Sequence, residues 1–160
     1  MQIRPAGDGD KSAVWRAIEP VFRAGETYPL ARDVTERDAL AYWFSAGHAV
    51  FVADQDGAVI GSYYLRANTG GGGSHVANCG YITAPHARRH GVARAMCEHS
   101  LARARARGFA AMQFNFVIST NETAVKLWHS CGFRIVGRLP RAFAHPTLGY
   151  VDALVMFREL

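Results

Sequence analysis

The segment between His75 and Gly108 constrains the fold most, because a strand passes into a helix there through a short basic turn. The stretch His75–Thr83 has the character of a strand, and Pro85 stops further pairing because proline has no backbone N–H. A helix is predicted to start near Gly91 and to end at Gly108 as a C-cap. Its apolar residues recur at intervals of three and four, which places them on one face: Ala93, Met96, Cys97, Leu101 and Ala104.

The turn Arg88-Arg89-His90-Gly91-Val92-Ala93 has the features of an anion-binding site. A helix N-terminus leaves four backbone N–H groups unpaired and carries about half a positive charge. Gly91 has no Cβ, so a phosphate can approach the backbone, and Arg88 and Arg89 add positive charge. An ordinary strand–helix turn can contain the same short motif. Its position after a strand and before an amphipathic helix favours the phosphate site.

The rest of the chain also alternates between strand-like and helical segments. Strands are predicted at Met1–Pro5, Ala49–Ala53, Val59–Arg66, Met112–Ile118, Phe133–Val136 and Tyr150–Phe157. Helices are predicted from Asp10 to about Arg23, after the cap Thr35, and over Asn121–Ser130 with Thr120 or Asn121 as cap. Gly70–Gly73 is predicted to be a flexible hairpin loop. Strands separated by helices need crossovers, so we predict one α/β domain over residues 1–160. Its single sheet is mixed and mainly antiparallel, with helices on both faces.

Composition narrows the class of protein. Hydrophobic residues make up 49% and charged residues 19%, and no apolar run approaches the length of a membrane span. The cysteines Cys79, Cys97 and Cys131 form no CxxC pair, which favours a reduced, cytoplasmic protein without a metal site. The net charge is +5, and arginines crowd the turn and the following helix, which favours a phosphate-bearing partner. Nucleic acid ranks last among such partners, because no motif of an RNA-binding module accompanies the arginines.

Two motifs together resemble the GNAT superfamily of N-acetyltransferases. The basic turn is similar to the acetyl-CoA-binding motif of that superfamily. The pattern Asn121-x-x-Ala124-x-x-Leu127-Trp128-x-x-x-Gly132-Phe133 is similar to its next helix and strand. The resemblance covers roughly Ala49 to the last residue. It implies an acetyl-CoA-dependent N-acetyltransferase in which the strands His75–Thr83 and Met112–Ile118 splay apart, often with a bulge.

The same resemblance assigns the acetyl-CoA site. The pantetheine arm is expected to lie in the splay and to pair with the backbone of Tyr81, Ile82 and Thr83. Asn121 is expected to reach the pantetheine or the sulfur. The pyrophosphate is expected on the backbone N–H groups from Arg89 to Arg94, so the cofactor loop comprises Arg88, Arg89, His90, Gly91, Val92, Ala93 and Arg94.

The chemistry of acetyl transfer suggests roles for individual groups. The attacking amine must first lose a proton, and the backbone N–H of Tyr81 is the candidate donor to the thioester oxygen. The usual general acid of the superfamily is a tyrosine, and Trp128 stands in its place. An indole N–H donates a hydrogen bond but does not give up its proton usefully. We therefore assign stabilisation of the leaving thiolate to the amide of Asn121, which also suits a helix cap.

The acceptor side contains asparagines where strands are expected, although asparagine is depleted in strands. The triplet Asn78, Asn115 and Asn121 resembles a narrower branch, the proline-analogue acetyltransferases that act on L-azetidine-2-carboxylate. Asn78 and Asn115 are expected on the two splayed strands, where they face the acyl centre from either side. In the narrower branch, Asn78 and the backbone around Asn115 and Phe116 hold the substrate carboxylate. Glu26 or Tyr28, in the loop between the first two helices, contacts the amine. Glu26, Asp152 or water remains open as the base.

Two other functions remain open at this stage. One is acetylation of a protein N-terminus or a lysine, for which an acidic, open groove would be expected. The other is a non-catalytic module that binds acetyl-CoA, a reading supported by Trp128 in place of tyrosine. We expect a small-molecule amine as acceptor and, by analogy with the superfamily, a homodimer; neither a membrane nor a metal is expected to take part.

Overall fold

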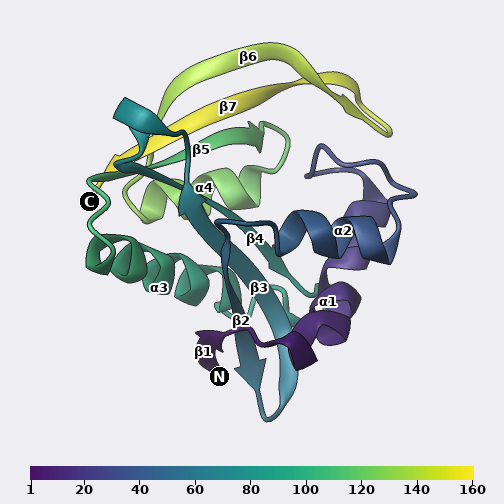
Figure 1. The fold of residues 1–160 in the computed structure, drawn as a ribbon. Helices are drawn as coiled ribbons and strands as arrows, with labels where there is room; N and C mark the ends of the chain where they lie inside the picture. Colours follow the sequence, from purple (N-terminus) through teal and green to yellow (C-terminus); the bar gives the residue numbers. More distant parts are fainter.

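The computed structural model describes residues 1–160, which form one seven-stranded sheet in the order β1-β2-β3-β4-β5-β7-β6 (Figure 1). The elements follow the chain as β1 (Gln2–Pro5), α1 (Lys11–Ala24), α2 (Glu36–Trp43), β2 (Ala49–Gln55), β3 (Ala58–Ala67), β4 (Val76–Thr83), α3 (Val92–Ala106), β5 (Ala111–Ile118), α4 (Glu122–Ser130), β6 (Arg134–His145) and β7 (Gly149–Glu159). Only β4 and β5 pair in parallel. The predicted fold class, a mixed and mainly antiparallel sheet with helices, is confirmed.

The helices cover opposite faces of the sheet (Figure 1). Alternate residues of a strand point to opposite faces, and the two hydrophobic clusters follow this alternation. Tyr63 and Cys79 belong to the cluster under α3 and α4. Tyr64 and Ile82 belong to the cluster under α1 and α2. From Tyr63 to Leu65 on β3 and from Ala77 to Ile82 on β4, odd-numbered side chains therefore face α3 and α4, and even-numbered side chains face α1 and α2.

The parallel pairing of β4 and β5 stops after two residue pairs, Val76–Ala111 and Ala77–Met112. Beyond these pairs the strands diverge, and we call this divergence the fork. β5 carries a bulge between Phe114 and Val117, where its register with β7 shifts by one residue. A bulge bends its strand and disrupts the ladder, which explains why β5 turns away from β4. The predicted splay is confirmed.

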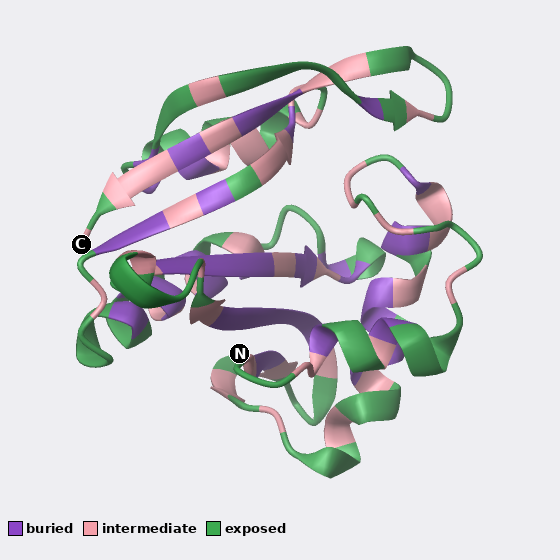
Figure 2. Cartoon of the chain, turned by 45° about the horizontal axis from the view of Figure 1, so that its top comes forward, coloured by how far each residue is buried: buried purple, intermediate pink, exposed green.

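The last hairpin is longer than predicted. The prediction ended the sixth strand at Val136, but β6 continues to His145 and pairs with β7 through two register shifts. Gly137 and Pro140 conceal the strand in the sequence; both are tolerated because β6 is an edge strand with bulges. Arg141 adopts a left-handed φ of 52° at the second shift, and its N–H donates to Asp152. Figure 2 shows β6 exposed along most of its length.

The helix ends largely follow the predicted caps. Thr35 accepts a hydrogen bond from Asp38 N at 3.1 Å, as expected of the N-cap of α2. Asn121, not Thr120, caps α4. Asp10 occupies the N-cap position of α1, but its carboxylate binds Arg4 and the N–H of Gly7 instead of the helix. Gly71–Gly73 form a short 3-10 turn within the predicted loop. None of the helices combines the length and apolar character needed to span a membrane.

Gly80 in β4 allows a tyrosine to lie across the sheet. An added Cβ at Gly80 would stand 2.5 Å from Cε1 and 2.7 Å from Oη of Tyr64. Tyr64 is opposite Gly80 in the β3–β4 register and is 5% exposed. The phenol ring therefore occupies the space above the glycine.

We predict that Gly80→Ala lowers the free energy of unfolding by about 1–3 kcal/mol, because an overpacked core must shift a buried ring. Urea unfolding followed by tryptophan fluorescence measures the change. Gly72→Ala is the matched control, since an added Cβ there meets nothing within 4 Å and the φ is not left-handed. Equal stability of the two variants would contradict the packing argument.

Candidate functional site

The turn before α3 presents an unbroken series of unpaired donors. The backbone N–H groups of residues 89 to 94 have no acceptor within the chain, and the first bond of the helix joins Ala95 N to Gly91 O at 3.0 Å. Arg89 and Gly91 have φ values of 66° and 78°, so the chain turns sharply into the helix. Unpaired N–H groups at a helix N-terminus are the preferred partners of an anion. The predicted phosphate site therefore has its donors in place.

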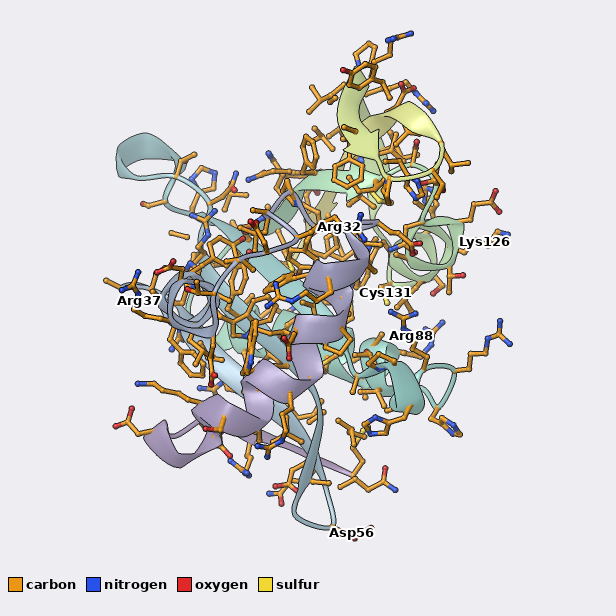
Figure 3. All side chains as sticks on the ribbon, turned by 90° about the vertical axis from the view of Figure 1, so that its right-hand side faces the viewer. Arg32, Arg37, Asp56, Arg88, Lys126 and Cys131 are labelled. Atoms are coloured by element: carbon orange, nitrogen blue, oxygen red, sulfur yellow. The ribbon has the colours of Figure 1, made fainter.

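The turn carries positively charged side chains, and most of them have no partner within the chain. Arg88, Arg89 and His90 are exposed, and none of them forms an ion pair or a side-chain hydrogen bond. Figure 3 shows Arg88 in the turn at the start of α3. Arg94 differs, because its guanidinium donates to Ser130 Oγ at 2.8 Å and lies 4.0 Å from Glu98. Arg94 thus ties α3 to the end of α4, while Arg88 and Arg89 remain free for a ligand.

The backbone of β4 offers hydrogen bonds to the fork at alternate residues. Val76 O and Ala84 N both pair with the β3 side, and the β3–β4 register shows no shift between them. Even-numbered residues of β4 therefore bond to β3, and Tyr81 and Thr83 direct their N–H and C=O groups into the fork. Ile82 was predicted to pair with a ligand, but its backbone groups face β3. Of the three predicted residues, only Tyr81 and Thr83 offer backbone groups there.

Tyr28 reaches the fork from the loop between α1 and α2. Its hydroxyl donates to Tyr81 O at 3.1 Å, and its ring packs edge-on against Phe22 at 5.4 Å and tilted against Trp43 at 6.0 Å. Burial raises the pKa of Tyr28 well above the ordinary value, so the phenol remains a donor at neutral pH. The structure thus brings together the predicted residues Tyr28 and Tyr81. Glu26 in the same loop is exposed and forms no ion pair.

An aromatic layer lies on the α4 side of the fork. The Trp128 ring packs 5.0 Å from the rings of Tyr81 and Phe114. The Tyr81 hydroxyl shares a hydrogen bond of 2.6 Å with Ser100. The indole N–H of Trp128 has no acceptor in the chain, and no buried side-chain N or O lacks a partner. That N–H is therefore accessible to a ligand or to water. Burial raises the pKa of Cys79 nearby to about 12, which excludes it as a thiolate at neutral pH.

Asn121 combines a cap with a free donor. Its Oδ1 accepts from Ala124 N at 3.3 Å at the start of α4. The Nδ2 group of the half-buried side chain has no partner within the chain. The geometry therefore allows the amide to cap the helix and donate to another group at the same time.

The other predicted asparagines belong to an amide network at the base of the fork. Asn78 is 5% exposed, and its Nδ2 donates to Gln113 O at 2.8 Å, just beyond the last β4–β5 pair. Gln113 donates to Asn115, and Asn115 donates to Asn68 at 2.7 Å. Sequence analysis missed Gln113 and Asn68; a glutamine inside a strand was the available signal. As predicted, Asn78 and Asn115 lie on the two diverging strands, β4 and β5, and the amide network joins them on the α1–α2 face.

Two further predicted residues, Phe116 and Asp152, lie in or next to the bulge of β5. Phe116 is half-buried, with its ring 6.4 Å from that of Phe143 in β6. Asp152 accepts from Arg138 at 2.7 Å and from Arg141 N at 2.9 Å. These bonds hold the pKa of Asp152 below its ordinary value, which makes the carboxylate a poor base.

Comparison with known proteins places the fold among acetyltransferases. The family model "Acetyltransferase (GNAT) family" matches residues 15–133. N-acetyltransferase aca1 of Schizosaccharomyces pombe is 27% identical over 150 residues, which cover 82% of this chain and 71% of the relative. The structure of a GCN5-related N-acetyltransferase from Kribbella flavida is 42% identical, with a TM-score of 0.94 over 99% of this chain and 97% of that chain.

A more distant structure supports the fold alone. YncA from Salmonella typhimurium, solved with its cofactor acetyl-CoA, is 22% identical. Its TM-score is 0.87 over 100% of this chain and 94% of that chain. The overall fold is therefore shared at low sequence identity.

We predict that inorganic diphosphate raises the thermal unfolding temperature of the protein, because it binds the unpaired N–H groups of the native turn. Replacing Arg88 by Ala and Arg89 by Gly should weaken this binding at least about tenfold, since charged hydrogen bonds contribute about 1.5–3 kcal/mol. Glycine at position 89 also accommodates the left-handed φ.

The matched control removes Arg105 and Arg107 at the far end of α3, which changes the net charge by the same amount. Differential scanning fluorimetry across diphosphate concentrations gives both affinities. If the control weakens binding as much as the turn variant, the effect reflects net charge and the turn is not the site.

Proposed function

The chain belongs to the acetyltransferase (GNAT) family, and on that premise we propose that it transfers the acetyl group of acetyl-CoA to the amine of a small molecule. The family assignment makes it an acetyl-CoA-dependent N-acetyltransferase. The observation that carries the proposal is the combination of unpaired N–H groups at residues 89 to 94 with the open backbone edge of β4. The unpaired N–H groups suit a diphosphate, and the open edge of β4 suits an extended chain of amides.

The residues fit acetyl-CoA along its length. The diphosphate would lie on the turn before α3, between the backbone N–H groups and the free guanidinium groups of Arg88 and Arg89. The pantetheine amides would pair with Tyr81 and Thr83, as an added strand does at a sheet edge. The Tyr81 carbonyl keeps a second lone pair beside the bond from Tyr28. Acetyl-CoA supplies an acetyl thioester that is reactive toward a neutral amine.

The chain's own groups support the transfer in two ways. The N–H of Tyr81 points into the fork and can stabilise negative charge that develops on the thioester oxygen. The Nδ2 group of Asn121 and the indole N–H of Trp128 are donors without a partner in the chain. Either donor can stabilise a thiolate by a hydrogen bond, and no acidic tyrosine is required, because a thiolate is a weaker base than an amine, with a conjugate-acid pKa of about 8.5 against about 10.4.

The polar groups near the fork favour a small zwitterion as acceptor, such as a cyclic imino acid of the azetidine-2-carboxylate type. Asn78 and Asn115 each use one amide N–H within the network, and the second N–H of each is a neutral donor suited to a carboxylate. The bulge at Asn115 and Phe116 interrupts the β5–β7 ladder and leaves backbone groups for a ligand. The loop residue Tyr28 covers the fork, which suits a small acceptor better than a peptide chain.

We predict that thiol is released from acetyl-CoA in the presence of azetidine-2-carboxylate or another proline analogue. The panel also contains primary amino acids, polyamines and short peptides. Asn121→Asp should lower kcat about 10- to 100-fold, because it removes a donor to a charged group but keeps a good N-cap. Asn121→Ala should show the same kinetic loss and, in addition, lose about 1 kcal/mol of stability through the missing cap.

Other outcomes would redirect the assignment. Saturable acetyl-CoA binding without release across the panel would support a non-catalytic binding module. Release with peptides alone would support a protein N-terminal or lysine acetyltransferase. Full activity of Asn121→Asp would remove Asn121 from the mechanism and leave Trp128 as the remaining donor.

A further inference from the structure

Two tyrosine hydroxyls flank the backbone of β4 where its open edge begins. The hydroxyl end of Tyr64 lies directly above Gly80, within 2.7 Å of the position an added Cβ would take. The hydroxyl of Tyr28 lies 3.1 Å from the carbonyl oxygen of Tyr81, the next residue. An amine that approaches a thioester held by the Tyr81 N–H from the α1–α2 face therefore comes close to the Tyr64 hydroxyl.

Tyr64 is hydrogen-bonded to a second tyrosine, which is exposed to solvent. Its Oη lies 3.1 Å from the Oη of Tyr42 on α2. Tyr64 is 5% exposed, whereas Tyr42 is 37% exposed. The pair thus links a buried tyrosine over β4 with a tyrosine that is exposed to solvent.

The surrounding aromatic side chains fix this pair. The ring of His48 stacks on Tyr64 with centroids 4.2 Å apart, and Trp43 packs edge-on against it at 5.1 Å. The indole of Trp43 is itself held by a 2.9 Å bond to Ser62. His48 is held by a 3.0 Å contact between its Nδ1 and Trp43 O. Each ring has little freedom to rotate, so the two hydroxyls remain within hydrogen-bond distance of each other.

Four aspartates are poorly suited to take the proton of the acceptor, because each carboxylate is bound to an arginine. Asp10 and Asp54 both bind Arg4, Asp38 binds Arg37, and these bonds lower the pKa of each carboxyl. Asp152 is held by Arg138 in the same way. An acceptor ammonium must still lose a proton before its nitrogen can attack.

We propose that Tyr64 and Tyr42 form a proton relay that carries the proton of the acceptor ammonium from the fork to solvent. The inference rests on the proposed acetyl transfer. The N–H bond of the ammonium breaks and its proton bonds to Tyr64 Oη. The original proton of Tyr64 passes to Tyr42 Oη, and the proton of Tyr42 passes to water. Both phenols end neutral, and the amine gains the lone pair it needs.

The environment of the two phenols agrees with a relay rather than a base. Burial raises the pKa of Tyr64 above the ordinary value, so the side chain is a neutral phenol throughout the physiological range. Burial also lowers the pKa of His48, which keeps its imidazole neutral beside the pair. No positive charge from His48 therefore opposes the passage of a proton.

The test compares two classes of acceptor in the same enzyme preparation. One acceptor is an ordinary amine, an ammonium ion at pH 7, and the other is an alkoxyamine of similar shape, which is neutral at pH 7. For Tyr64→Phe we expect kcat with the ammonium acceptor to fall about 10²-fold, while kcat with the alkoxyamine changes less than about threefold. Tyr42→Phe should shift the ratio in the same direction. Because each ratio is taken within one variant, partial misfolding does not affect it.

The matched control is Tyr63→Phe on the same strand. The Tyr63 hydroxyl points to the opposite face, where it bonds to His99 Nδ1 at 2.6 Å. Its ratio of the two activities should equal that of the wild type. An unchanged ratio in Tyr64→Phe, with an active wild-type enzyme, overturns the relay and leaves acetyl transfer intact. A wild-type enzyme that acetylates neither acceptor class overturns the proposed function and the relay together.

Discussion

The early end of the β4–β5 ladder is the constraint on which the site depends. Two parallel pairs hold the strands together, and the bulge after Phe114 then turns β5 away. Buried backbone groups without partners are costly, so the groups freed along β4 must find other acceptors and donors. The structure satisfies one of them with Tyr28 and leaves the N–H of Tyr81 directed into the fork. The same interruption that weakens the sheet thus creates a row of donors and acceptors for an extended ligand.

Different sets of residues surround the fork on the two faces of the sheet. On the α3–α4 face, Tyr81 and Trp128 pack against Phe114 and form the wall beside the predicted cofactor. On the α1–α2 face, the amide network and the tyrosine pair lie along the approach proposed for the acceptor. Gly80 lies between the two faces. Because it has no side chain, Tyr64 can lie across β4 on the α1–α2 face, while the odd-numbered neighbours of Gly80 pack on the α3–α4 face.

The geometry of the basic turn before α3 depends on neighbouring residues, which is why the sequence predicts it. Its donors come from consecutive residues, and the left-handed φ at Gly91 agrees with the residue type. The cap of α4 at Asn121 is equally local, since its partner is only three residues away. By contrast, the sequence prediction ended β6 too early, because Gly137 and Pro140 resemble a loop when the strand that pairs with them is unknown. It also assigned the backbone of Ile82 to the ligand. Strand register decides which way a backbone group points, and the sequence alone does not give that register.

The amino-acid sequence by itself determined the order of strands and helices, the mixed sheet and the position of the basic turn before α3. These features depend on hydrophobic periodicity and on backbone groups within a few residues of one another. Only the tertiary structure decided that Tyr64 covers Gly80, that Tyr42 continues it to solvent, and that Asn78 closes the base of the fork. These contacts join residues separated by 16 to 35 positions. Their existence depends on strand register and helix placement, which no local pattern specifies.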